Sequence, residues 1–331
     1  MRMLIKLFIG ALALVIVFGY GAMVGRFQLF PYEYLWALAK TVTSGGVGHY
    51  DEYDRLVSFS SKTRVECPLQ DHRTGVLLFI GQSNSANHGQ EMVKTAYPQK
   101  VANYFDGKCY VAQSPLLGAS GQNGEYATLI ADKLIQKGTY DNVIIISSGI
   151  GGSSITPWAE DGPLNNMLLS VVDEFSARLN VTDIIWHQGE SDAIYFMHTK
   201  TYVDMFLSLM KTLSERGVDA PYYMSIASLC KNPIVTYPNK ITRAQVELIK
   251  DHDNIFLGVN TDELVTDKHR SDGCHFNGKG QEVTAVAIAS PDIVLFDTIC
   301  QFSIIFFVTF FTFFTLLFFT FIFISFAYFF F

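Results

Sequence analysis

The sequence predicts an α/β fold of three layers, in which helices cover both faces of a mostly parallel, five-stranded sheet. Two observations predict it. Short runs of aliphatic and β-branched residues recur through the middle of the chain, and segments with the helical spacing of apolar residues separate them. Apolar strands that alternate with helices are typical of parallel sheets buried on both faces. We expect this domain at residues 67–292, with a transmembrane helix before it.

The expected elements follow from those runs. Apolar strands are expected at residues 76–80, 143–146, 184–186, 222–226 and 255–257, and a further strand, second along the chain, is expected to begin at Cys109. Helices are expected at residues 126–136, 164–179, 201–213 and 241–249, with a last helix after residue 277. Ligands of such sheets bind beyond the carboxyl ends of the strands, so the loops that follow the strands are expected to carry the chemistry.

The first 26 residues differ from the rest of the chain. Residues 7–25 carry no charge, and as a helix they are about as long as a bilayer core is thick. Arg2 and Lys6 precede them, and basic residues favour the cytoplasmic side. We predict a membrane anchor at residues 1–26 and a juxtamembrane segment at residues 27–66. The alternative is a cleaved signal peptide, and either one places the domain outside the cytoplasm.

The C-terminal end is rich in phenylalanine. Of the 28 Phe residues, 15 lie between residues 302 and 331. The stretch is long enough to cross a bilayer, but it lacks the flanking basic residues of a usual membrane helix. Residues 298–331 are therefore either a second membrane segment or a low-complexity tail, and the sequence leaves both open.

Composition and charge exclude some functions. The 331-residue chain is 49% hydrophobic, which is too apolar for a disordered protein. Three of its 24 basic residues precede residue 27, so the remainder carries 21 basic and 31 acidic residues, a net charge of −10. A nucleic-acid partner needs a basic surface and is not expected. No cysteine stands in a CxxC or Cys/His spacing, so no zinc site is expected.

Three strand-end loops carry residues with chemical potential. GQSN follows the first strand and places Ser83 in a tight turn that can expose its hydroxyl. WHQGESD, at residues 186–192, offers the amide of Gln188 as a hydrogen-bond donor. DGCHF places Asp272 three residues before His275, where a carboxylate can bind the imidazole. Taken singly, each has an ordinary structural explanation, such as a helix N-cap for the serine.

Together and in this order, the three motifs resemble the SGNH hydrolase superfamily, and most closely its sialate O-acetylesterase-like branch of carbohydrate esterases. The resemblance covers roughly residues 70–290 and implies an SGNH-type, flavodoxin-like sheet. Gln82 and Gln188 stand where Asp and Asn are usual in the superfamily. Both departures are what that branch shows, so they sharpen the assignment.

The resemblance implies a role for each motif residue. Ser83 matches the nucleophile, His275 the general base and Asp272 the acid that orients it. The oxyanion hole would consist of the N–H of Ser83, the side chain of Gln188 and the N–H of a glycine, for which we choose Gly121 among neighbouring glycines. This chemistry requires no metal and no organic cofactor.

Substrate contacts are expected from the same loops and from the glycine-rich turn after the third strand. The residues concerned are Gln82, Asn84, Gly152, Ser153, Trp158 and Glu190. For the turn and Trp158, the alternative is a simple glycine-rich turn beside a core tryptophan.

Two disulfides are expected, and Cys300 is left over. We prefer Cys230–Cys274, because the strand at residues 222–226 should end near the His275 loop. We prefer Cys67–Cys109 because the first strand, after Cys67, and the second, which begins at Cys109, could lie side by side. Free buried thiols are the alternative.

The function that the resemblance implies is the removal of O-acetyl groups from a sugar or glycan, at the outer face of a membrane. A carbohydrate O-acyltransferase would use the same residues. A lipase or thioesterase is a further alternative, and so is a non-catalytic, membrane-tethered carbohydrate-binding module.

Overall fold

The computed structural model describes residues 48–230 and 234–290. The predicted anchor at residues 1–26 and the Phe-rich segment at residues 298–331 lie outside them, and both stay predictions. Within the described residues, no helix combines the length and the apolar character needed to cross a bilayer.

The domain is built on one sheet of eight strands, in the order β10-β9-β8-β4-β7-β5-β6-β3. Six strands are parallel: β4 (Thr74–Gly81), β5 (Val101–Phe105), β7 (Asn142–Ser147), β8 (Asp183–His187), β9 (Tyr222–Ile226) and β10 (Ile255–Asn260). Two antiparallel strands, β6 (Lys108–Val111) and β3 (Arg64–Val65), form one edge. A separate pair consists of β1 (Gly48–Tyr50) and β2 (Leu56–Phe59).

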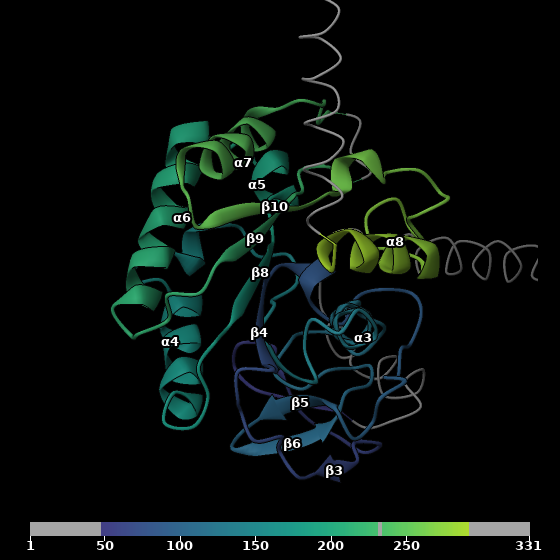
Figure 1. Ribbon diagram of the computed structural model, residues 1–331. Coiled ribbons are helices and arrows are strands. Elements are labelled where there is room, and N and C mark those ends of the chain that lie inside the picture. Colours follow the sequence, from purple (N-terminus) through teal and green to yellow (C-terminus); the bar gives the residue numbers. More distant parts are fainter. Residues whose placement is uncertain (1–47, 231–233, 291–331) are drawn as a thin grey trace, which may run out of the picture. The chain divides into compact units, whose positions relative to one another are not determined.

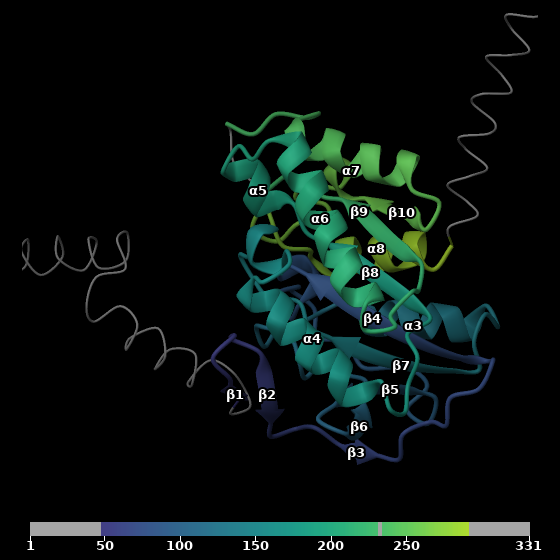
Figure 2. The ribbon, with the colours of Figure 1, turned by 90° about the vertical axis from the view of Figure 1, so that its left-hand side faces the viewer.

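Helices cover both faces of the sheet, which confirms the three-layer prediction (Figures 1 and 2). One face carries α4 (Pro163–Phe175), α6 (Thr199–Ser214) and α7 (Lys240–Asp251). The other carries α3 (Ala127–Gln136) and α8 (Gly278–Ile288). Alternate residues of β4 enter the two cores: Leu78 packs in the first and Leu77 in the second. Both are fully buried, which explains why the strand has no polar side.

The five predicted apolar strands correspond to β4, β7, β8, β9 and β10, but the predicted number was wrong, since the sheet has eight. The missed strand β5 contains Asn103, a polar residue that interrupts its apolar run. Asn103 is nonetheless buried, because its side chain bonds the backbone N–H and C=O of Leu117 at 2.8 and 3.2 Å. The strand expected to begin at Cys109 is β6, four residues in which half-buried positions alternate with buried ones, and the two-residue edge strand β3 was not predicted.

Both predicted disulfides are present. Cys230–Cys274 joins the end of β9 to the loop before α8, as expected. The reason given for Cys67–Cys109 was wrong, because β6 does not lie beside β4: β7 and β5 separate them. Instead β6 pairs with β3, and Cys109 lies opposite Val65, two residues before Cys67. Two disulfides suggest that the domain lies outside the cytoplasm.

The compact unit that contains the eight-stranded sheet includes residues before residue 67. It includes residues 50–57 and continues from residue 62. Leu56 is fully buried, and its backbone bonds Ala119 and Gly118 at 2.9 Å each. Part of the segment assigned to the juxtamembrane region is thus packed with the predicted domain.

Candidate active site

The carboxyl end of β4 places Ser83. The strand ends at Gly81, whose φ of +131° suits only glycine. A Cβ at Gly81 would lie 2.2 Å from the carbonyl oxygen of His187, so the backbone of β8 passes too close for any side chain. Gln82 N–H then bonds that same oxygen at 2.9 Å, and Ser83 opens the short 3-10 helix η1 (Ser83–Ser85). The hydroxyl is thereby fixed at the sheet's carboxyl edge.

Asp272 and His275 form the expected pair. The Nδ1–H of His275 donates to Asp272 Oδ2 at 2.7 Å. Asp272 Oδ1 accepts from the backbone N–H of Cys274 and of His275, at 2.8 and 2.7 Å. Burial raises the pKa of Asp272, but the bonds from the His275 ring and from these two N–H groups outweigh it and lower that pKa to about 2. A carboxylate on Nδ1 leaves Nε2 as the imidazole's proton acceptor.

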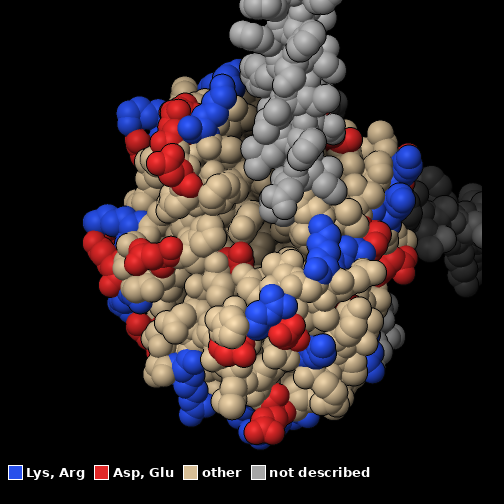
Figure 3. Space-filling view, viewed as in Figure 1, with Lys and Arg blue, Asp and Glu red and all other residues tan. Residues whose placement is uncertain are grey.

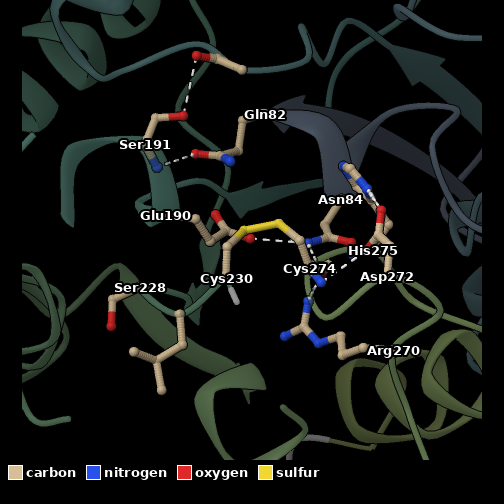
Figure 4. The surroundings of a disulfide bond; sticks show 12 residues. Gln82, Asn84, Glu190, Ser191, Ser228, Cys230, Arg270, Asp272, Cys274 and His275 are labelled. Atoms are coloured by element: carbon tan, nitrogen blue, oxygen red, sulfur yellow. Dashed lines mark hydrogen bonds and ion pairs between the residues drawn. A yellow bond between two sulfur atoms is a disulfide. The ribbon is translucent and has the colours of Figure 1, made fainter. Parts of the chain in front are cut away.

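The two loops that carry these groups lie side by side (Figure 4). Asn84, the residue after Ser83, bonds the backbone of Cys274 and of Phe276, which flank His275. Gln90 N–H also donates to Phe276 O at 2.8 Å. Among the described residues, no direct hydrogen bond joins Ser83 to His275. Catalytic hydrogen bonds often tighten only when the substrate binds.

Gly121 is placed against the loop of Ser83. Its φ is +80°, and it forms a parallel bridge with Asn87. A Cβ there would lie 2.4 Å from Asn87 O, so only glycine fits. No hydrogen bond between described residues uses the N–H of Gly121 or of Ser83. Two unpaired amides on adjoining loops are what an oxyanion hole requires.

Gln188 follows β8 and is fully buried. Its amide nitrogen contacts the Asp192 carboxylate, Ser153 O at 3.2 Å and Gln82 Oε1 at 3.4 Å. The opposite amide orientation would set its oxygen against the carboxylate oxygen of Asp192. Burial raises the pKa of Asp192 to about 6, although the bonds from Gln188 and from Ile155 N–H work against this rise. The nitrogen of Gln188 therefore already has partners within the protein.

Residues 73–290 match the model of a family described as carbohydrate esterase, sialic acid-specific acetylesterase. The chain belongs to this carbohydrate esterase family. By family it is a carboxylic ester hydrolase, and an acetylated carbohydrate is the implied substrate class. No curated protein sequence matches the chain.

Solved structures resemble this carbohydrate esterase at low sequence identity. A protein from Arabidopsis thaliana has a TM-score of 0.52 at 16% identity, over 66% of this chain and 96% of that one. A carbohydrate acetylesterase from Xanthomonas citri has a TM-score of 0.44 at 17% identity, over 65% and 55%. The esterase EstA from Pseudoalteromonas has a TM-score of 0.42 at 14% identity, over 68% and 99%. The first of these shares the fold.

Most residues expected to touch substrate have partners inside this carbohydrate esterase. Gln82 is buried, and its Oε1 accepts from the N–H groups of Gly189 and Ser191 at 3.3 and 3.2 Å. Trp158 is fully buried and donates to Ser153 Oγ at 3.0 Å, which agrees with the core-tryptophan alternative. Gly152 is exposed and a Cβ there would meet open space, although its carbonyl oxygen accepts from Ser191 Oγ at 3.1 Å.

Asn84 and Glu190 belong to a buried polar network beneath the site (Figure 4). Asn84 Nδ2 donates to Glu190 Oε1 at 2.9 Å, and the same oxygen lies 3.3 Å from His187 Nε2. His187 Nδ1 lies 2.7 Å from the hydroxyl of Tyr126. Burial raises the pKa of Glu190. The contacts with His187 and Asn84 outweigh this effect, so the pKa is lowered to about 2. These groups contact one another, so they support the site from inside.

Sequence reasoning missed His88. Its ring stacks on that of His275, with centroids 5.5 Å apart, and its Nε2 lies 3.1 Å from Ser120 Oγ. That hydroxyl accepts from Gly151 N–H at 2.7 Å. A histidine five residues beyond Ser83 gives no signal of its own in the sequence. Within the described part of this esterase, no group of three His, Cys, Asp or Glu side chains could hold a metal ion.

Proposed function

We propose that the protein removes O-acetyl groups from a sugar or glycan by a serine mechanism. The observation that carries the proposal is the His275–Asp272 pair, which the contacts of Asn84 hold beside the loop of Ser83. Within a carbohydrate esterase family, this arrangement supports acyl transfer through a covalent intermediate.

In the first half of the reaction, the Ser83 hydroxyl attacks the ester carbonyl and His275 Nε2 takes its proton. Asp272 keeps Nδ1 protonated and stabilises the imidazolium that forms. The N–H groups of Ser83 and Gly121 donate to the oxyanion, each contributing about 3 kcal/mol to transition-state stabilisation. His275 then protonates the leaving sugar hydroxyl, and water hydrolyses the acetyl-enzyme with the same base.

Gln188 would be the third oxyanion donor. To donate, its second N–H must leave Ser153 O, which lies 3.2 Å away, while the first stays on Asp192. We propose that the backbone at Gly152 and Ser153 shifts when the substrate enters. This shift would release the N–H of Gln188 from Ser153 O. Charges of both signs are interspersed on the face of the molecule shown in Figure 3.

The full-length protein, with and without single substitutions, tests the proposal by acetate release from aryl acetates and O-acetylated sugars. Ser83→Ala and His275→Ala should each lower kcat/KM by about 10³-fold or more. Ser170→Ala and His72→Ala, at exposed positions, are the matched controls and should stay near wild type. Unchanged activity in Ser83→Ala would contradict the proposal. A deacetylated sugar added as acceptor separates hydrolysis from acyl transfer.

We propose further that residues 1–26 tether the domain to a membrane, on its non-cytoplasmic side. The two disulfides of the domain are consistent with an oxidising compartment. In a protein that also lacks residues 298–331, removal of residues 1–26 should move the esterase activity from the membrane fraction to the soluble fraction. Activity that sediments equally with and without residues 1–26 would contradict the tether.

A further inference from the structure

The side chain of Asn84 reaches both sides of the proposed base. Its Nδ2 donates to Cys274 O at 3.2 Å, and its Oδ1 accepts from Phe276 N–H at 3.3 Å. Cys274 and Phe276 are the two neighbours of His275, and Asn84 is the neighbour of Ser83. One buried amide thus connects the backbone around the base to the residue beside the nucleophile.

Glu190 fixes which way this amide faces. Asn84 Nδ2 lies 2.9 Å from Glu190 Oε1, and a carboxylate can only accept, so the nitrogen must face it. The amide oxygen is then directed to Phe276 N–H, and the second N–H to Cys274 O (Figure 4). Glu190 is fully buried and is held in turn by His187, whose Nε2 lies 3.3 Å from it.

Gln90 N–H also donates to Phe276 O at 2.8 Å, but Gln90 lies seven residues beyond Ser83, whereas Asn84 adjoins it. The remaining groups restrain the same loop from elsewhere in the fold. Arg270 is buried and donates to Thr261 O at 2.9 Å and to Cys274 O, and the disulfide ties Cys274 to Cys230. These contacts hold the loop to the region after β9 and β10. They do not set its distance from the loop after β4.

We propose that Asn84, oriented by Glu190, is a positioning residue that sets the separation between the Ser83 hydroxyl and the His275 imidazole. The inference rests on the proposed function of those two residues. It assigns Asn84 and Glu190 to alignment of the reacting groups, where the sequence had suggested contact with substrate. A misplacement of about 1 Å between reacting groups can cost about 10²-fold in rate.

The loss of this alignment should appear in kcat. Asn84→Ala should lower kcat by about 10²-fold and change KM by less than about threefold, because the substrate pocket keeps its lining. Asn84→Asp should be at least as severe, since it sets a second carboxylate against Glu190. Adding Glu190→Gln to Asn84→Asp restores a donor between the two side chains and should recover about tenfold in kcat.

Asn165→Ala is the matched control. Asn165 is equally buried in α4 and donates to Trp158 O at 3.1 Å and to Thr212 Oγ1 at 2.8 Å, away from both catalytic loops. It should lower the thermal midpoint about as much as Asn84→Ala does, with kcat within about threefold of wild type. If Asn84→Ala fails to fold, Glu190→Gln alone provides the measurement, with an expected tenfold loss in kcat.

Two outcomes would overturn the inference. One is a kcat within threefold of wild type in folded Asn84→Ala, or in Glu190→Gln where Asn84→Ala does not fold. The other is an Asn84→Asp/Glu190→Gln double variant no more active than Asn84→Asp. Ser83→Ala, assayed in parallel, distinguishes failure of the positioning role from failure of the proposed function. If Ser83→Ala is inactive while Asn84→Ala is fully active, only the positioning role fails. If Ser83→Ala is active, the proposed function fails.

Discussion

The loop that carries Ser83 and the loop that carries Asp272 and His275 are held in different ways. The Ser83 loop leaves β4, a central strand with β7 and β8 on either side, and it is buried. The Asp272 side chain is about half exposed, and the loop around it is fixed by Arg270, Asn84 and a disulfide. The first loop takes its rigidity from the sheet, and the second depends on individual contacts, so damage to each should look different.

The largest effect is expected from Asp272→Asn, in the loop held by individual contacts. An amide at this position favours the wrong imidazole tautomer, so kcat should fall by about 10³-fold or more. The free energy of unfolding should change little, because the carboxylate is half exposed. Acetate release and chemical denaturation of the same preparation measure both. A stable variant with more than a tenth of wild-type kcat would contradict this account.

Gly81→Ala should produce the opposite pattern in the loop held by the sheet. The new methyl group would lie 2.2 Å from His187 O at a φ of +131°, so we expect a loss of about 4 kcal/mol in the free energy of unfolding. Gly138→Ala is the control, because Gly138 also has a positive φ, +70°, but faces open space. It should cost about 1 kcal/mol. Equal losses in the two variants would show that the close approach of β8 is unimportant.

The two disulfides allow the comparison to be sharpened. They close segments of 42 and 44 residues, so replacing either pair by serines should destabilise the protein to a similar extent, about 3 kcal/mol. Only loss of Cys230–Cys274 should also lower kcat, by about tenfold, because Cys274 adjoins His275. If loss of Cys67–Cys109 lowers kcat by the same factor, the position of the crosslink does not matter for catalysis.

The smallest effect concerns Asp192, which supports Gln188. Its pKa is raised to about 6 by burial, above the ordinary value of 3.8, so the folded protein binds this proton more tightly than the unfolded chain. Its contribution to stability is therefore highest at low pH and is lost as the pH rises from about 4 to 6. Asp192→Asn removes the charge and should gain at most about 3 kcal/mol relative to wild type at pH 8, but not at pH 4. Denaturation of both proteins at the two pH values measures the difference, and a difference independent of pH would contradict it.

Local pattern predicted the strands that read as apolar runs, wherever they lie in the sheet. The strands β4, β7, β8 and β9 lie inside the sheet and are mostly buried, and the edge strand β10 is also mostly apolar although Phe256 is exposed, so such runs are visible in the sequence. Strand β5 was missed because its buried Asn103 is compensated by Leu117, fourteen residues later, which no local pattern records. Strands β6 and β3, with four and two residues, are too short to show a period.

The site could be predicted only at the level of its motifs. Asp272 and His275 are three residues apart, so their contact follows from local spacing. Asn84 and Glu190 lie 106 residues apart, and Asn84 and Cys274 lie 190 apart, so the sequence could not distinguish contact with substrate from support of the loop. His88 was invisible for the same reason, since its position against His275 depends on the fold.

The most direct test of the central claim is mass spectrometry of the full-length protein after reaction with a serine-directed fluorophosphonate. The account predicts a single adduct on Ser83, which forms at least about 10³-fold more slowly in His275→Ala because the base that activates the hydroxyl is gone. An adduct on another residue, or labelling of Ser83 at the same rate in both proteins, would contradict it.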